Sequence, residues 1–303
     1  MRGSGQKPGA VLVTGARGFM GRTLGMLLQR AGYRVVGVDL PGGAGSAGEQ
    51  LVGDITDQEQ LRAVFASRKI EQIVHLAAIL PTAAQRDPLR ATEVNVRGSL
   101  HVLEMPREFG VRRVVFGSSL SVYGTCAADY VVSEADRAAP EDLYGAAKVY
   151  VEQMGEAYRE RYGMEFVSLR IGRVVGPGAQ STTSAWRSQI FERLSAESPA
   201  QISLPYVASE KILLVHVDDV ARMLLQAARP AHAVYNACCE SVAVGELKRQ
   251  FEALNSNLRV KLGEAAVVGN PRMVDCSRFS GEFNFKMPSI FEQLRAAAGG
   301  DAR

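Results

Sequence analysis

The sequence has few of the residues that hold metals, build disulfides or cross membranes. Its 303 residues include 4 cysteines, 4 histidines and 1 tryptophan. The cysteines lack metal-ligand spacing, and the vicinal pair Cys238-Cys239 is poorly placed for a structural bridge, so we expect no metal site and a reducing, cytoplasmic setting. No run approaches the roughly 18 consecutive apolar residues of a membrane span. The short polar start, residues 1–8, lacks the apolar stretch of a signal peptide.

An excess of charge of one sign is also missing. The chain carries 35 basic and 32 acidic residues, for a net charge of +3. The basic residues are spread along the chain without a Lys/Arg run, so nothing argues for nucleic acid as a partner. The content of 47% hydrophobic and 22% charged residues is that of an ordinary soluble globular protein with one or two domains.

The first 175 residues alternate short β-branched runs with longer amphipathic stretches, which predicts a parallel sheet covered by helices. The expected strands are residues 10–14, 34–38, 72–76, 111–117 and 165–170, with further strands at 212–217 and 234–237. The expected helices are 19–31, 57–67, 89–109, 142–162 and one that begins near residue 218. Asp57 is expected to be an N-cap, and Pro106 to kink its helix or end it early.

This pattern predicts an α/β fold, a doubly wound parallel Rossmann sheet with a smaller C-terminal substrate-binding lobe. The dinucleotide-binding domain is expected at residues 8–175 plus 212–240. The pattern loosens after Gly176-Pro177-Gly178, so residues 176–211 plus 241–303 are assigned to the lobe. We expect the lobe to fold over the strand ends, where ligands of open α/β sheets bind.

Tyr144 and Lys148 are four residues apart on the expected helix 142–162 and therefore project from the same face. A lysine ammonium beside a phenol lowers the pKa of the phenol from about 10 towards the operating pH, which makes a general base for a hydroxyl proton. A Tyr/Lys pair at this spacing often arises by chance. The serines upstream, Ser118, Ser119 and Ser121, strengthen its assignment to an active site.

Three glycines, Gly15, Gly18 and Gly21, directly follow the first strand and open the next helix. Glycine allows the backbone to approach a pyrophosphate, and the helix N-terminus supplies N–H donors. Asp39 ends the next strand, where a carboxylate accepts the ribose hydroxyls of adenosine and repels a 2′-phosphate. We therefore predict NAD rather than NADP, although Arg17 could soften this preference. The alternative is a tight turn with a solvated aspartate.

Several motifs in this order resemble those of the extended short-chain dehydrogenases/reductases, the group of the NAD-dependent sugar-nucleotide epimerases and dehydratases. The resemblance covers roughly residues 10–240. Its motifs are the glycine turn, Asp54-Ile55, His75-Leu76-Ala77-Ala78, Asn95-Val96-Arg97-Gly98, Ser118 to Gly124, the Tyr144/Lys148 pair and His216-Val217-Asp218-Asp219-Val220.

The resemblance implies three catalytic residues. Tyr144 as a phenolate takes the proton of a secondary alcohol, Lys148 lowers the tyrosine pKa and holds the nicotinamide ribose, and Ser119 donates a hydrogen bond to the reacting oxygen. The implied cofactor contacts are Gly15, Gly18, Phe19, Met20, Gly21, Asp39, Asp54, Ile55, Leu76, Ala77, Ala78, Asn95, Tyr144 and Lys148. For Asp54 a role as a cap or turn acid and for Asn95 a purely structural role remain open, and His75 is expected to pack under the sheet.

The chain departs from the sugar-nucleotide members at three places. Arg173 stands where they carry an asparagine that touches the substrate phosphates. Its guanidinium suits a carboxylate or phosphate, or alternatively a surface ion pair. Ile212-Leu213-Leu214 replaces an Arg-Asp-Phe run, and Leu120-Ser121 replaces the Asp-Glu of dehydratases. The predicted substrate contacts are Ser119, Ser121, Tyr144 and Arg173. Four residues of the loose lobe are expected to be ordinary surface, with substrate contact as the alternative, namely Trp186, Arg187, Arg193 and Tyr206.

These departures favour an NAD-dependent oxidoreductase that moves hydride between a secondary alcohol of a small sugar-acid or hydroxy-acid-like substrate and the nicotinamide, with Arg173 on the carboxylate. The alternative is a sugar-nucleotide epimerase, or less favoured a dehydratase, that uses the same site with transient oxidation. A third hypothesis is a cofactor-binding regulatory protein without catalysis. We expect a homodimer that pairs through helices 89–109 and 142–162.

Overall fold

The computed structural model describes residues 9–43, 45–179, 184–227 and 231–299. The chain forms two compact units. The first comprises Met1–Ser118, Ala147–Leu169 and Leu224–Ala233, and the second Ser119–Ala146, Arg170–Met223 and Val234–Arg303. These units are defined by how tightly the residues pack. The division into a dinucleotide-binding domain and a substrate-binding lobe concerns function and stays a prediction.

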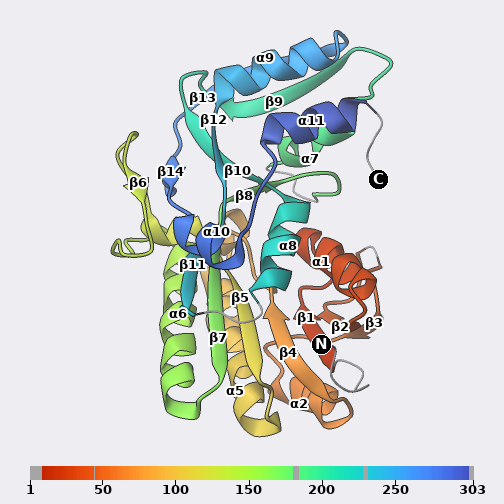
Figure 1. Ribbon diagram of the computed structural model, residues 1–303, viewed down its shortest axis with the longest axis vertical. Coiled ribbons are helices and arrows are strands. Elements are labelled where there is room, and N and C mark those ends of the chain that lie inside the picture. Colours follow the sequence, from red (N-terminus) through yellow and green to blue (C-terminus); the bar gives the residue numbers. More distant parts are fainter. Residues whose placement is uncertain (1–8, 44, 180–183, 228–230, 300–303) are drawn as a thin grey trace. The chain divides into compact units, whose positions relative to one another are not determined.

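The central feature of the fold is a seven-stranded sheet with the strand order β11-β7-β5-β4-β1-β2-β3 (Figure 1). The pairs β3–β2, β2–β1, β1–β4 and β4–β5 are all parallel. Strand order runs outward in both directions from β1 and β4, as in doubly wound sheets. The predicted α/β Rossmann class is therefore confirmed.

The elements up to residue 119 follow the predicted alternation except for β3, which is absent from the expected strands and follows β2 without a helix between them. They are β1 (Ala10–Thr14), α1 (Phe19–Arg30), β2 (Arg34–Asp39), β3 (Glu49–Val52), α2 (Gln58–Ala66), β4 (Ile70–His75), α3 (Pro81–Arg86), α4 (Pro88–Thr92), the π-helical turn η1 (Glu93–Gly98), α5 (Ser99–Phe109) and β5 (Arg113–Ser119). As predicted, Asp57 caps α2, with its carboxylate accepting from the Gln60 N–H.

The helical stretch predicted at residues 89–109 is present but not uniform. It consists of α4, the π-helical turn η1 and α5. Of the two predicted effects of Pro106, the early end is wrong, because α5 continues to Phe109 and closes on Gly110 in the left-handed conformation; the kink stays a prediction. Pro106 lies in the last turn, so its missing N–H removes only one hydrogen bond close to the helix end.

The remaining elements begin at the turn after β5. They are η2 (Leu120–Tyr123), β6 (Val131–Val132), α6 (Leu143–Tyr162), β7 (Glu165–Ile171), β8 (Arg173–Val175), α7 (Trp186–Glu192), β9 (Ala200–Tyr206), β10 (Lys211–His216), α8 (Val217–Gln226), β11 (Val234–Asn236), β12 (Glu240–Ala243), α9 (Val244–Leu254), β13 (Leu258–Ala265), β14 (Met273–Val274), α10 (Ser277–Phe283) and α11 (Ile290–Ala298).

The second unit has small sheets of its own. Strand β10, predicted at residues 212–217, pairs with β8 and β12 in a three-stranded sheet. Strands β9 and β13 pair in parallel over most of their length, and α9 lies along them (Figure 1). The region 179–210, which lacks a clear sequence pattern, thus contributes a helix and a strand whose partner lies more than 50 residues away.

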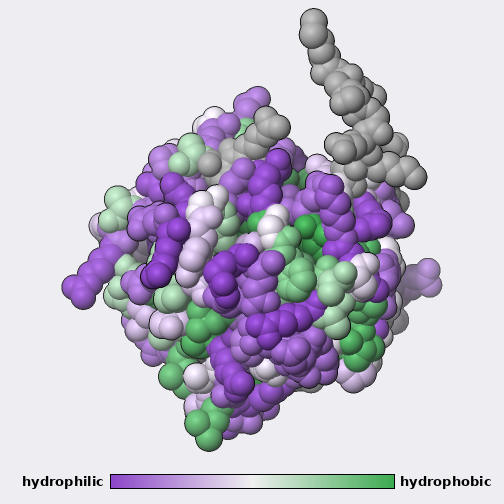
Figure 2. Space-filling view, turned by 90° about the horizontal axis from the view of Figure 1, so that it is seen from below, coloured by the Kyte–Doolittle hydropathy of each residue, from purple (hydrophilic) through white to green (hydrophobic). Residues whose placement is uncertain are grey.

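Each unit has its own apolar core. In the first, side chains of β1, β4 and β5 pack with α2 and α5, for example Leu12, Phe65 and Phe116. In the second, α7, β9 and α9 share a core that includes Trp186, which is 4% exposed. The face in Figure 2 is mostly hydrophilic, with apolar residues in small groups. Within the described ranges, no helix has the length and apolarity needed to cross a bilayer.

Candidate active site

The glycine turn between β1 and α1 leaves no room for side chains. Gly15 has φ 69°, and a Cβ there would lie 2.7 Å from the Ala77 backbone nitrogen. A Cβ on Gly21 would lie 2.1 Å from the Gly15 carbonyl oxygen. Gly18, at the N-cap of α1, provides no side-chain cap, and Phe19 and Met20 form the first helical turn. A backbone cradle at a helix N-terminus fits the pyrophosphate of a dinucleotide.

Asp39 lies at the end of β2, next to this turn. One carboxylate oxygen accepts from the Arg17 N–H at 2.7 Å and the other from the Leu40 N–H at 2.8 Å. The Arg17 guanidinium donates to the carbonyls of Leu40 and Gly42. The carboxylate is therefore held in place at the strand end by backbone donors, where it suits a ribose diol.

Asp54 and Ile55 follow β3 and differ in environment. Ile55 is buried in the core of the first unit. The Asp54 carboxylate pairs with Arg90 at 2.7 Å and accepts from the Thr56 N–H at 2.9 Å. Burial opposes its ionisation, but these donors win and lower the pKa of Asp54. The carboxylate is thus ionised and already engaged, and it acts as a turn acid, because Oδ1 accepts from the N–H and the hydroxyl of Thr56.

A buried chain of hydrogen bonds holds the segment after β4. The Thr14 hydroxyl accepts from the N–H groups of Leu76 and Ala77 and lies 2.7 Å from Nδ1 of His75. The other ring nitrogen lies 2.9 Å from the Ser99 hydroxyl, which donates to the Asn95 carbonyl. Since Thr14 already accepts twice, its proton points to Nδ1, so His75 is neutral with its proton on Nε2.

His75 is packed under the sheet, as expected. It is 1% exposed and stacks on Phe116. Burial, with the charge of Lys148 as a second cause, lowers the pKa of His75 to about 3. The half-buried residues that follow, Leu76, Ala77 and Ala78, line the edge next to the glycine turn, because Ala77 lies against Gly15.

Asn95 lies in the π-helical turn η1 and uses its whole amide on one residue. Its Oδ1 accepts from the Ile79 N–H at 2.7 Å, and its Nδ2 donates to the Ile79 carbonyl at 2.9 Å. The widened turn points the side chain at the loop after β4. Asn95 therefore positions this loop, and its contact with a cofactor stays a prediction.

Ser119, Ser121 and Tyr144 come together in the second unit. The Ser119 hydroxyl caps η2 by accepting from the Ser121 N–H at 3.2 Å, and the Ser121 hydroxyl lies 2.9 Å away. The Tyr144 phenol is hydrogen-bonded to Ser119. Three hydroxyls thus meet at one point, as proton transfer to and from a substrate oxygen requires.

The Tyr144 phenol is subject to opposing charges. Burial is the largest effect and raises its pKa to about 12, and the Asp142 carboxylate adds to the rise. The Arg187 guanidinium and the Ser119 hydrogen bond act in the opposite direction. A positive charge beside this phenol therefore helps it to act as a base near neutral pH.

Lys148 stands one helical turn after Tyr144 on α6 and is 4% exposed. Its ammonium donates to the Gly117 carbonyl at 2.7 Å and lies 4.5 Å from the centre of the Phe116 ring. Burial lowers the pKa of Lys148 to about 7, while the charge of Glu152 raises it. Glu152 was not among the predicted site residues, although its position four residues after Lys148 could have indicated it.

Two arginines of the second unit lie near one another, and one of them, Arg187, acts on Tyr144. Arg173 on β8 stands over the Tyr206 ring, and Arg187 on α7 over the Trp186 ring. Burial, then the charge of Arg173, lowers the pKa of Arg187 to about 10. Arg187 Nε has no hydrogen-bond partner in the described part of the chain. The expectation of ordinary surface is wrong for Trp186, which is buried, and for half-buried Arg187, because α7 packs onto β9.

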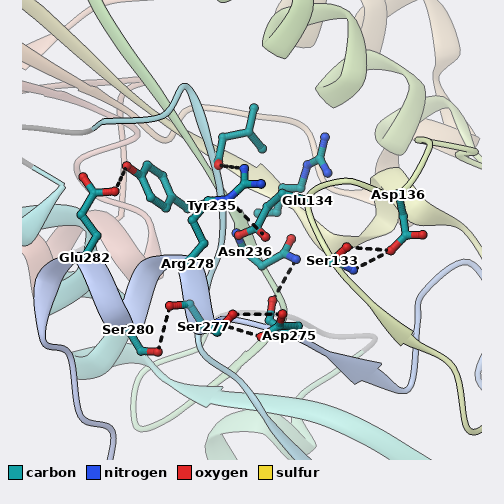
Figure 3. Close-up of polar contacts among 12 residues, drawn as sticks. Ser133, Glu134, Asp136, Tyr235, Asn236, Asp275, Ser277, Arg278, Ser280 and Glu282 are labelled. Atoms are coloured by element: carbon teal, nitrogen blue, oxygen red, sulfur yellow. Dashed lines mark hydrogen bonds and ion pairs between the residues drawn. The ribbon is translucent and has the colours of Figure 1, made fainter.

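A polar network supports the turn that carries Ser119. The Tyr123 hydroxyl donates to Asn236 Oδ1 at 2.7 Å and accepts from Arg170 at 2.8 Å. Figure 3 shows the next shell around Asn236. Its N–H donates to Glu134 and its amide to the Asp275 carbonyl, while Arg278 pairs with Glu134. The network joins η2 to β11 and α10 within the second unit.

The metal and disulfide chemistry can be stated for the described ranges. They contain no group of three or more His, Cys, Asp or Glu residues able to hold a metal ion. All four cysteines are free thiols.

Comparisons with known proteins agree with this geometry. The model of the NAD dependent epimerase/dehydratase family matches residues 11–238. A solved Thermus thermophilus UDP-glucose 4-epimerase in complex with NAD superposes with a TM-score of 0.83 at 24% identity, covering 96% of this chain and 98% of that one. At this identity the likeness concerns the fold.

Curated relatives include epimerases and dehydrogenases. A Mycolicibacterium smegmatis UDP-glucose 4-epimerase is 36% identical over 234 residues, 73% of each protein. The mitochondrial L-threonine 3-dehydrogenase of Sus scrofa is 27% identical over 252 residues, 79% of this chain and 67% of that protein. A Pseudomonas syringae uronate dehydrogenase is 30% identical over 165 residues, 54% of this chain and 58% of that protein.

The chain spans about half the length of two other UDP-glucose 4-epimerases that match, 51% and 52%. The family model, in contrast, covers most of the chain, and the glycine cradle with Asp39 fits the family's cofactor, NAD. The chain is an enzyme that belongs to the NAD-dependent epimerase/dehydratase family.

Proposed function

We propose that the protein is an NAD-dependent dehydrogenase that acts on a secondary alcohol of a small sugar-acid or hydroxy-acid-like substrate. The observation that carries this proposal is the pair formed by Arg187, which acts on the proposed catalytic phenol, and its neighbour Arg173. Arg187 acts on Tyr144 electrostatically, Arg173 acts on Arg187, and neither forms a carboxylate ion pair in the described ranges. A substrate carboxylate is the natural counter-ion for such a pair.

In the proposed reaction Tyr144 takes the hydroxyl proton of the alcohol. Ser119, already hydrogen-bonded to the phenol, donates to the substrate oxygen as it becomes a carbonyl, and Ser121 orients Ser119. Lys148 provides the positive charge one turn along α6 and holds the nicotinamide ribose. NAD supplies the hydride acceptor when bound.

The charges around the arginines support a negatively charged substrate. The pKa of Glu210 is lowered mainly by Arg272 and to a smaller extent by Arg173. This carboxylate already forms an ion pair with Arg272 at 2.9 Å. The charge of the Asp142 carboxylate raises the pKa of the Tyr144 phenol. Arg187, with Arg173 beside it, thus keeps positive charge near the Tyr144 phenol, which must lose its proton before it can act as a base. An anionic substrate compensates this positive charge.

Positions at which family members bind a diphosphate are unsuited to that role in this chain. Ile212, Leu213 and Leu214 are at most 1% exposed within β10. Leu120, where dehydratases carry an acid, is equally buried. L-Threonine and uronates, the substrates in the names of two relatives, both combine a carboxylate with a secondary alcohol, which favours the dehydrogenase over the alternatives.

A sugar-nucleotide epimerase is the second candidate. Curated relatives named UDP-glucose 4-epimerase favour it, and the same serine, tyrosine and lysine would serve. The two activities differ in net redox change, because an epimerase returns its hydride and accumulates no NADH.

The proposal is tested by an NADH-formation assay with NAD and a panel of hydroxy acids, sugar acids and sugar nucleotides. Each acid is paired with its neutral analogue, for example a uronic acid with the corresponding aldose. We expect stoichiometric NADH from at least one acid and little from its neutral partner. Interconversion of sugar nucleotides without NADH would establish the epimerase instead, and NAD binding without any turnover would favour the regulatory hypothesis.

Three further proposals accompany this function. Residues 176–211 plus 241–303 form the substrate-binding lobe. The protein is a homodimer through α5 and α6, which is supported by exposed apolar side chains such as Phe109 and Tyr162. It works in the cytoplasm, in keeping with its free thiols. A monomeric mass by light scattering at micromolar concentration would contradict the dimer.

A further inference from the structure

Behind Lys148 lies a buried carboxylate that the proposed reaction does not yet use. Glu152 is one helical turn after Lys148 on α6 and is 5% exposed. Its Oε1 accepts from the Ser118 hydroxyl on β5 at 2.6 Å and from the Ser168 hydroxyl on β7 at 3.0 Å. Two strands of the sheet therefore hold this carboxylate against the face of α6 that carries Lys148.

Neutral hydrogen bonding alone does not require a carboxylate at this position. A glutamine of the same shape would offer its amide oxygen to both serine hydroxyls without placing a charge in the interior. Burying an ionised carboxylate among neutral donors is costly unless a cation is nearby. The group that benefits from the negative charge is Lys148.

Three other neighbours of Lys148 in the described part of the chain carry no negative charge. His75 on β4 is neutral with a strongly lowered pKa, and Phe116 and the Gly117 carbonyl on β5 provide a ring face and one acceptor. On its own helix the neighbouring titratable groups are Tyr144 and Glu152. Glu152 is therefore the carboxylate placed to balance the ammonium.

We propose that Glu152 is a positioning residue of the active site. It keeps Lys148 protonated at neutral pH and holds its ammonium against the Gly117 carbonyl on β5. The inference rests on the proposed function for the role of Lys148 in catalysis, but the pairing itself can be measured without substrate or cofactor. A lysine that lost its charge could neither stabilise the phenolate nor donate to ribose hydroxyls with full strength.

The test is a direct titration of Lys148 by NMR with lysine labelled at 13Cε. The sequence contains seven lysines, and Lys148→Arg identifies the resonance by its disappearance. In Glu152→Gln we expect the titration midpoint of Lys148 to fall by about one pH unit or more. Glu156→Gln, one turn further along α6 and paired with Arg159 at the surface, is the matched control and should leave the midpoint unchanged.

An unchanged Lys148 midpoint in folded Glu152→Gln would overturn the inference. If that variant does not fold, Glu152→Asp retains the charge and should keep the midpoint close to that of the wild type. A wild-type Lys148 that is already neutral at pH 6 would also overturn it. Where a substrate is turned over, the basic limb of the pH–rate profile should move with the midpoint. If no substrate is found but the midpoint shifts, the pairing stands and the proposed function alone fails.

Discussion

At the scale of single residues, the chemistry depends on charges around one phenol. Burial pushes the pKa of Tyr144 up to about 12, whereas Arg187 and Ser119 pull it down. The Lys148 ammonium lies one turn along α6, where we propose that the buried Glu152 carboxylate keeps it charged. The proposed base thus combines a hydroxyl cluster with one cation, Arg187, that acts on the phenol.

Replacing Tyr144 by phenylalanine removes the proton acceptor and leaves the ring. We expect turnover to fall by at least about two orders of magnitude, within the usual range for a general acid–base group. The dissociation constant for NAD, measured by calorimetry, should rise far less than turnover falls, because the other cofactor contacts remain. Near-normal turnover with NAD still bound would refute the role of Tyr144.

At the scale of elements, the β1–α1 turn is the most tightly constrained segment of the cofactor region. Gly21→Ala places a methyl group 2.1 Å from the Gly15 carbonyl oxygen, so the turn must deform. We expect a loss of at least about 1 kcal/mol in the free energy of unfolding, as for other strained or overpacked substitutions. NAD affinity should fall by at least about tenfold, because the N–H donors move.

The matched control is Gly281→Ala in α10, where an added Cβ meets nothing within 4 Å. This helical glycine should accept alanine with a gain of up to about 1 kcal/mol. Urea unfolding of both variants gives the comparison. Equal effects at the two sites would show that the turn is not constrained as described.

The elements also show which features can be predicted from the sequence. Local signals such as the Asp57 cap and the glycine turn act within a few residues, and the structure has them where expected. Other features depend on contacts between separate segments. The Asn95 side chain is bound to Ile79, which lies in the loop after β4. The α7 helix, which carries Arg187, packs on β9, a strand that the sequence pattern does not predict. For Glu152 the spacing was visible, but its serine partners come from two separate strands.

At the scale of the whole molecule, the buried ammonium of Lys148 links stability to pH. Its pKa is about 7 in the fold and about 10.4 in the unfolded chain. Between these values the unfolded chain binds more protons, so this group makes stability rise as pH increases from about 7 to about 10. Below pH 7 its destabilising effect is fully present.

Lys148→Met removes this dependence. The variant also leaves the Glu152 carboxylate without its cation and the Gly117 carbonyl without a donor, so its stability at any single pH reflects these losses as well. We expect the free energy of unfolding of the wild type, relative to that of the variant, to rise between pH 7 and pH 10. Urea unfolding at several pH values measures this change, since titrating groups away from Lys148 contribute equally to both proteins. A difference that does not vary with pH would mean that Lys148 titrates normally in the folded protein.

We propose that the hydride-transferring site recognises a substrate carboxylate through Arg173 and Arg187. The most direct measurement is the ratio of kcat/KM for an active acid over that for its neutral analogue, by NADH formation. The account predicts a wild-type ratio of at least about 100, equivalent to about 2.7 kcal/mol. In Arg173→Met with Arg187→Met the ratio should collapse towards one while NAD still binds. An undiminished ratio in the double variant, or a wild type that forms no NADH from any acid, would contradict it.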